Sequence, residues 1–143
     1  MGYWDPSRSL GFQCRVSMDP IHIFYLEALS VLSALVWAIS QPFSTSLECI
    51  AIFTDNMNTV DMFNSLRAQP KYNPILLTSV DLSIKHNMQF RIFHIPGELN
   101  TVADPLSRFR NDIAIKEAAQ HTHLPLQISL FQPPHLTEGV AKK

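Results

Sequence analysis

The sequence predicts a mixed α/β domain, because strand-like and helix-like segments alternate along the chain. Residues 23–40 are long and apolar enough for a buried helix, whereas the apolar run CIAIF at 49–53 has the length of a strand. A further strand-like segment, QFRIFHI, occupies 89–95. The chain has 143 residues, 46% of them hydrophobic and 16% charged. This composition suits one domain with a modest core and excludes a disordered chain.

The first third of the chain predicts two strands followed by a long helix. Residues 2–4 and 11–16 favour strands on either side of a turn. Pro20 suits the opening of the helix over 23–40, and Pro42 ends it. We expect the helix to lie in a soluble core rather than in a membrane, because Glu27 within it would cost about 2.5–3.5 kcal/mol at the centre of a bilayer.

The middle of the chain predicts a strand at 49–53, buried on both faces because its apolar run is continuous. Helices are expected over 58–68 and 74–85, and a strand over 89–95. The turn PGELN then leads into a short helix that Asn100 can cap. These elements place one domain in residues 1–110. Residues 111–143 carry a weaker pattern with several prolines, which predicts an extended tail.

The charge and the cysteine content limit the classes of function that are compatible with the sequence. Eleven Lys and Arg against twelve Asp and Glu give a net charge of -1, which excludes a module that holds nucleic acid through bulk positive charge. An enzyme that acts on nucleic acid through a few contacts and metal ions remains compatible. Two cysteines are too few for a disulfide framework, and the N-terminus lacks the apolar region of a signal peptide. We therefore expect an intracellular protein, in cytoplasm or nucleus.

Three carboxylates occupy positions at which a carboxylate with a purely structural role is uncommon. Glu27 lies within the apolar helix, Asp55 directly follows a buried strand, and Asp104 lies in the short helix after PGELN. Each has a structural alternative: Glu27 as a solvated residue, Asp55 as a helix cap, and Asp104 as a first-turn carboxylate favoured by the helix dipole. If all three face inward, they repel one another, and a divalent cation such as Mg²⁺ or Mn²⁺ would remove that cost. Two such ions can support phosphodiester hydrolysis.

Three phrases resemble the ribonuclease H domain of retrotransposon reverse transcriptases of the LTR or tyrosine-recombinase type. They are LEALSV around Glu27, TDN around Asp55, and PGELNTVADPLSR around Asp104. The resemblance covers about residues 1–110. It implies a ribonuclease H-like mixed sheet of five strands flanked by helices, with two Mg²⁺ ions held by four carboxylates. It also implies cleavage of the RNA strand of an RNA–DNA hybrid, with the rest of a reverse transcriptase polyprotein as a partner.

The resemblance maps catalytic and metal-binding roles onto Glu27, Asp55 and Asp104, and leaves the fourth carboxylate open. Asp5, in the phrase DPS, is the candidate, but only four residues precede it, too few for a central strand. The alternative is that the family's first strand is missing and Asp5 is a turn residue before proline. The chain is then either a metal-dependent nuclease or a non-catalytic remnant that binds nucleic acid or a protein. A missing central strand would leave a gap in the sheet and favour pairing with another chain.

Other residues have secondary roles in this interpretation. Pro105 stands where the family usually has alanine and is expected to bend the segment that carries Asp104. His94 is expected to be a strand residue rather than a proton shuttle. Several polar side chains could contact a hybrid, with a solvated surface as the alternative for each; they are Arg67, Lys71, Arg108, Arg110, Asn56 and Asn58.

Overall fold

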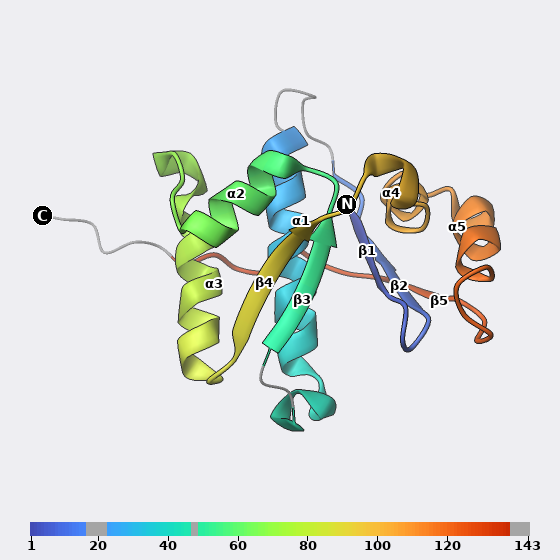
Figure 1. The fold of residues 1–143 in the computed structure, drawn as a ribbon, viewed down its shortest axis with the longest axis horizontal. Coiled ribbons are helices and arrows are strands. Elements are labelled where there is room, and N and C mark those ends of the chain that lie inside the picture. The colour runs from blue at the N-terminus through green and yellow to red at the C-terminus, as the bar shows by residue number, and fades with distance from the viewer. Residues whose placement is uncertain (17–22, 47–48, 138–143) are drawn as a thin grey trace, which may run out of the picture.

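The computed structural model describes residues 1–16, 23–46 and 49–137. It is a mixed α/β fold with helices flanking two sheets (Figure 1). The predicted helix opening at Pro20 lies outside the described residues. The first sheet contains β1 (Gly2–Asp5), β2 (Leu10–Gln13) and β5 (Gln127–Leu130), and the second contains β3 (Cys49–Thr54) and β4 (Gln89–His94).

The helices lie around these sheets in two groups (Figure 1). One group packs together beside β3 and β4, and consists of α1 (Ile23–Ser40), α2 (Met57–Ser65) and α3 (Asn73–Lys85). The other lies against β1 and β2, and consists of α4 (Ala103–Ser107) and α5 (Asn111–Ala118). Three short 3-10 turns connect the elements, at Pro42–Ser46, Pro70–Tyr72 and Gly97–Leu99.

Helix α1 is the central element of the core, and its predicted bounds of 23–40 are confirmed. Leu32 and Leu35 are almost completely buried, and α1 contributes to the two clusters that pack against β3 and α3. Among the described residues, α1 is the one helix long and apolar enough to cross a membrane. Length and composition are weak evidence for a span, because a core helix has the same properties.

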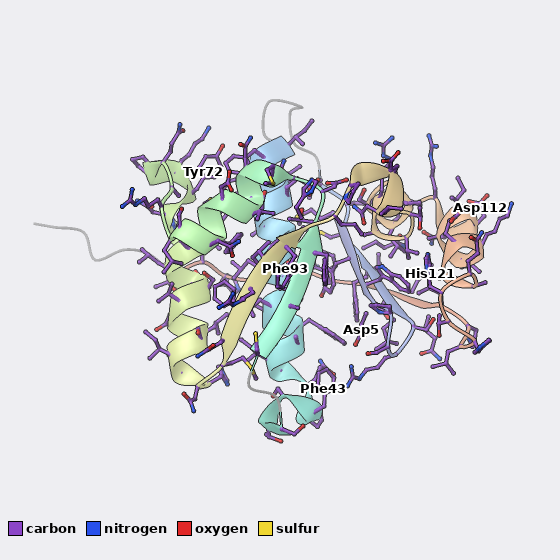
Figure 2. All side chains as sticks on the ribbon, viewed as in Figure 1. Asp5, Phe43, Tyr72, Phe93, Asp112 and His121 are labelled. Atoms are coloured by element: carbon purple, nitrogen blue, oxygen red, sulfur yellow. The ribbon has the colours of Figure 1, made fainter. Side chains whose placement is uncertain are left out.

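The prediction that β3 is buried on both faces is wrong. Ile50 and Thr54 are buried, whereas Cys49, Ala51 and Phe53 are exposed. Alternate side chains of a strand point to opposite faces, and in the described part of the chain α1 covers only one face of β3. On the other face, Phe53 is 61% exposed and stacks on Phe93 of β4, with ring centroids 5.3 Å apart (Figure 2 labels Phe93).

The strands do not form the single five-stranded sheet that the family resemblance implies. Strand β2 pairs antiparallel with β1 and parallel with β5, while β3 pairs parallel with β4. Both β1 and β3 contact α1, but they do not pair with each other. The strands are therefore divided between two sheets that share one helix.

The prediction of an extended tail after residue 110 is wrong for two segments, α5 and β5. Ala114 and Ala118 of α5 are buried against Val102 and Leu106. Strand β5 is joined to the first sheet, and at its start the Gln127 N–H donates to the Ser9 carbonyl, 3.0 Å away. The sequence pattern that predicts a helix was weak here, because α5 has only eight residues and buries small alanine side chains. These residues belong to the packed fold.

A substitution at Leu106 tests whether the packing of α4 and α5 contributes to the stability of the fold. Its side chain is completely buried between β1, β2 and α5. We expect Leu106→Ala to lower the free energy of unfolding by about 2–5 kcal/mol, the range for buried leucine truncations. Leu77→Ala, at a position 46% exposed on α3, is the matched control and should change it by less than about 0.5 kcal/mol. Urea denaturation measures both, and equal effects would contradict the packing described here.

Candidate functional site

Glu27, Asp55 and Asp104 line one cavity of about 220 Å³. They reach it from α1, from the residue that follows β3, and from α4. The start of β1 closes another side, where Met1 and Gly2 contribute to the wall. The structure thus brings together three carboxylates that are widely separated in the sequence.

Asp55 faces the cavity because β3 ends at Thr54 and the chain then turns into α2. Asn56, rather than Asp55, caps that helix, since its Oδ1 accepts the Thr59 N–H at 3.0 Å. The capping alternative for Asp55 is therefore excluded, and Asn56 has a structural role. The Asp55 Oδ2 instead accepts a hydrogen bond from the Asn100 Nδ2 at 3.3 Å.

Asp104 lies in the first turn of α4, where its carboxylate forms an ion pair with Arg108. The Arg108 Nε is 3.5 Å from the Asp104 Oδ1, and both side chains are about half exposed, at 62% and 48%. Such exposed pairs contribute little to stability. Helix α4 continues through Pro105, because proline is tolerated in the first turn of a helix, and the Leu106 N–H still donates to the Val102 carbonyl.

Glu27 is partly buried, and it is a carboxylate whose ionisation the fold disfavours. Burial raises the pKa of Glu27, and the negative charges of Asp55 and Asp104 raise it further. The Met1 ammonium group opposes them. The alternative of a fully solvated Glu27 is therefore wrong, since its side chain faces other carboxylates in a partly enclosed space.

Asp5 lies away from this cavity, and its candidate role as a fourth ligand is corrected. It ends β1, whereas Gly2 at the start of β1 lines the cavity. At about 3.3 Å per residue, the two ends of the strand are about 10 Å apart. The Asp5 carboxylate accepts hydrogen bonds from Ser7 and from Arg8, the latter at 2.9 Å. Figure 2 shows Asp5 on the same side of the molecule as Phe43, whose ring lies 3.5 Å from the Arg8 guanidinium carbon.

The described residues do not fit a metal ion as they stand. They contain no group of three His, Cys, Asp or Glu side chains close enough to hold one. Two of the cavity carboxylates are engaged instead by neighbouring side chains, Asp55 by Asn100 and Asp104 by Arg108. Carboxylate oxygens lie about 2.0–2.1 Å from a bound Mg²⁺, so these side chains would have to rotate to share an ion.

Asn100 is a site residue that the sequence analysis assigned differently. We expected it to cap a helix, but its side-chain amide holds the Asp55 carboxylate instead. His94 is exposed at the end of β4, as expected of a strand residue. Of the cationic candidates for contact with a hybrid, only Arg108 reaches a cavity carboxylate within the described part of the chain.

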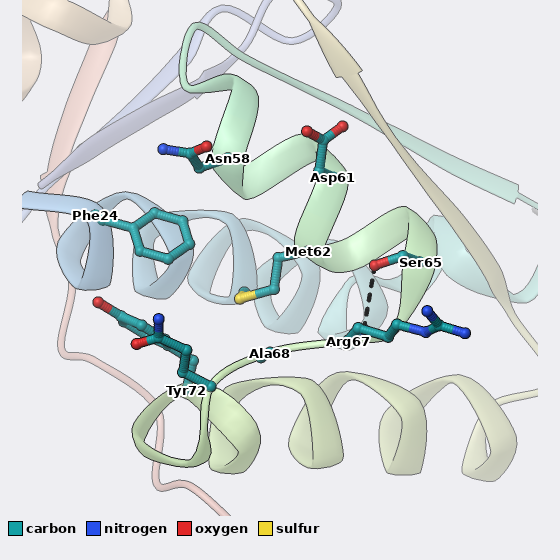
Figure 3. Close-up of a pocket in the computed structure, with 9 residues that line it drawn as sticks. Phe24, Asn58, Asp61, Met62, Ser65, Arg67, Ala68 and Tyr72 are labelled. Atoms are coloured by element: carbon teal, nitrogen blue, oxygen red, sulfur yellow. Dashed lines mark hydrogen bonds between the residues drawn. The ribbon is translucent and has the colours of Figure 1, made fainter.

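Two larger cavities lie elsewhere and include none of the four candidate carboxylates. One, of about 440 Å³, is formed where α2 faces α1 and the loop before α3 (Figure 3). Phe24, Met62 and Tyr72 form its apolar wall, and Arg67 lies at its edge. The other, of about 630 Å³, lies between α2, α3 and β4. Neither gathers the groups of a hydrolytic site.

Comparisons with models of protein families, with curated proteins and with solved structures gave no match to this chain.

The charge on Glu27 should reduce stability at neutral pH. Because its folded-state pKa is raised, its stabilising contribution is complete below the unfolded pKa and is lost as pH rises through the folded pKa. We expect Glu27→Gln to be more stable than the wild type at pH 7, with the difference shrinking as pH falls through the raised folded-state pKa of Glu27 and vanishing below the ordinary pKa of about 4.5. Urea denaturation across this pH range measures the effect.

Asp81→Asn provides the control for this experiment. Asp81 is a half-exposed carboxylate of α3, 3.1 Å from the Lys85 ammonium. It should show no gain in stability at pH 7. A Glu27→Gln protein that is less stable than the wild type at pH 7 would contradict the conclusion that the ionised Glu27 carboxylate destabilises the folded state.

Proposed function

We propose that the chain is a ribonuclease H-like domain of retroelement origin that hydrolyses the RNA strand of an RNA–DNA hybrid in the presence of Mg²⁺ or Mn²⁺. The observation that carries the proposal is the shared cavity of Glu27, Asp55 and Asp104. The same three residues lie in the phrases that resemble the family.

The electrostatics of the cavity support a role for a cation. Three carboxylates line a space of about 220 Å³, and their mutual repulsion contributes to the raised pKa of Glu27. A divalent cation would offset that repulsion and favour the ionised form of Glu27. Binding would require Asp55 to leave Asn100 and Asp104 to leave Arg108. Both partners lie at the protein surface or close to it, where exchanging such a contact costs little.

A second candidate function is a non-catalytic domain that binds a hybrid without cleaving it. It is favoured by the position of Asp5, which is bound to Ser7 and Arg8 at the far end of β1. With Asp5 excluded, the cavity has three of the four carboxylates that the family resemblance implies. The division of the strands between two sheets favours the same alternative.

Cleavage of an end-labelled RNA annealed to DNA distinguishes the two functions. We expect the wild-type chain to cleave the RNA slowly in Mg²⁺ or Mn²⁺, and not in the presence of a chelator. Asp55→Asn should reduce the rate at least about 100-fold, equivalent to about 2.7 kcal/mol of activation free energy. Asp81→Asn replaces a half-exposed carboxylate outside the cavity, and this variant should cleave at the wild-type rate.

Hybrid binding, measured by fluorescence anisotropy, completes the test. Binding without cleavage by the folded wild-type chain would establish the non-catalytic function. Cleavage that Asp55→Asn retains in full would show that the activity does not arise at this cavity. If the chain neither binds nor cleaves the hybrid, both functions are wrong.

A further inference from the structure

The edge of β1 that points away from β2 carries unpaired backbone groups. Met1 and Cys14 exchange two backbone hydrogen bonds, of 2.8 and 2.9 Å, which fixes the alternation of the antiparallel ladder. The N–H and C=O groups of Gly2 and Trp4 therefore point away from β2. Ser30 of α1 donates to the Gly2 carbonyl at 3.2 Å. The Gly2 N–H and both groups of Trp4 have no partner strand in the described part of the chain.

The edge of β3 that points away from β4 is also unpaired. The Ile95 N–H donates to the Thr54 carbonyl at 2.9 Å, so Thr54 and alternate residues before it direct their backbone groups to β4. Ala51 and Phe53 direct theirs to the open side. By contrast, the outer edge of β4 is protected, because the Asn64 side chain bonds both the N–H and the C=O of Ile92.

These two open edges face each other across one surface of α1. The outer neighbour of β1 is β2 and that of β3 is β4, and α1 contacts both β1 and β3 (Figure 1). They run in opposite directions, because the start of β1 and the end of β3 meet at the same cavity. A strand between them would be antiparallel to one and parallel to the other. We call these two open edges, together with the stripe of α1 that both strands contact, the strand slot, and define it by Gly2, Trp4, Ala51 and Phe53.

The stripe of α1 along the strand slot is uncharged beyond the carboxylate cavity, and at its far end the Arg8 guanidinium stacks on Phe43, which contacts Trp37. Ser30, Ala34 and Trp37 are only partly buried and lie along one stripe of α1 at helical spacing. Trp37 contacts Phe12 of β2, with ring centroids 4.9 Å apart, and packs against the cluster that contains Ile50 of β3. It therefore extends beneath the space between the two sheets.

We propose that the strand slot binds an extended, uncharged segment of a separate polypeptide, about five residues long, with apolar side chains at alternate positions. Only a peptide backbone can satisfy two facing rows of N–H and C=O groups at once, as in strand addition to a sheet edge. Apolar side chains on one face of the segment match the uncharged stripe of α1. The carboxylates at one end disfavour an acidic residue there. The proposal does not depend on nuclease activity.

A synthetic peptide tests the proposal on the whole chain. Its core alternates valine and threonine, with glycine and serine at both ends, and the control peptide has proline in place of threonine. Trp37, one of the two tryptophans of the chain, lies along the strand slot, whereas the indole of Trp4 packs against the cluster of α4 and α5 and lies 6.1 Å from the His121 ring. We expect a saturable change in tryptophan fluorescence with the first peptide. Binding of the proline peptide should be at least about tenfold weaker, because it lacks the N–H donors.

Ala51→Pro is the matched variant of the protein. It removes an N–H that points into the strand slot and leaves the ladder between β3 and β4 intact, since proline is tolerated where the N–H is not used. We expect peptide binding to weaken about tenfold. Leu77→Ala, at an exposed position on α3, is the control and should bind as the wild type does.

Hydrogen exchange on the wild-type chain locates the bound peptide even if Ala51→Pro fails to fold. We expect new protection at the amides of Trp4, Ala51 and Phe53, and none at Ile50. Protection confined to β5, whose Leu130 is 74% exposed, would overturn the proposal. So would equal binding of the proline peptide. Sedimentation that shows a stable dimer closing these amides without peptide would assign the slot to a second copy of the chain instead.

Discussion

The packing of α1 is the constraint on which the rest of the structure depends. The two sheets share no ladder of hydrogen bonds in the described residues, so their relative position is set by the elements that touch both. Helix α1 contacts β1 and β3, and its side chains Leu32 and Leu35 are almost completely buried. It also carries Glu27 into the cavity. A shift of this helix would therefore separate the carboxylates as well as the sheets.

The elements that could be predicted from the sequence have continuous patterns bounded by clear signals. The 18 apolar-rich residues of α1 end before Pro42, and the runs CIAIF and QFRIFHI coincide with β3 and β4. The burial of β3 could not be predicted, because an apolar run does not show whether a second layer covers it. Strand β5 escaped prediction because its partner, β2, lies more than 100 residues earlier, and four residues carry little periodicity.

The position of each carboxylate marked it as a candidate, and only the family resemblance implied that the three gather; their immediate partners could not be predicted. An aspartate after a buried strand and a glutamate in an apolar helix are both uncommon, and both face the cavity. The contacts of Asp55 with Asn100 and of Asp104 with Arg108 depend on side-chain rotamers across a turn. Asp5 resembled a ligand only by its neighbours in sequence. Its place at the far end of a four-residue strand depends on the pairing of β1 with β2.

The strand slot and the carboxylate cavity are physically linked through Gly2 and Ser30. Both residues line the cavity, and the hydroxyl of Ser30 donates to the carbonyl of Gly2 at the open edge of β1. A backbone inserted beside Gly2 would exclude water from the same side of the cavity. Because burial is the largest cause of the raised pKa of Glu27, occupying the slot would raise that pKa further unless a positive charge entered with it. The ionisation of Glu27 and the binding of a peptide in the strand slot are thus not independent, because each alters the free energy of the other.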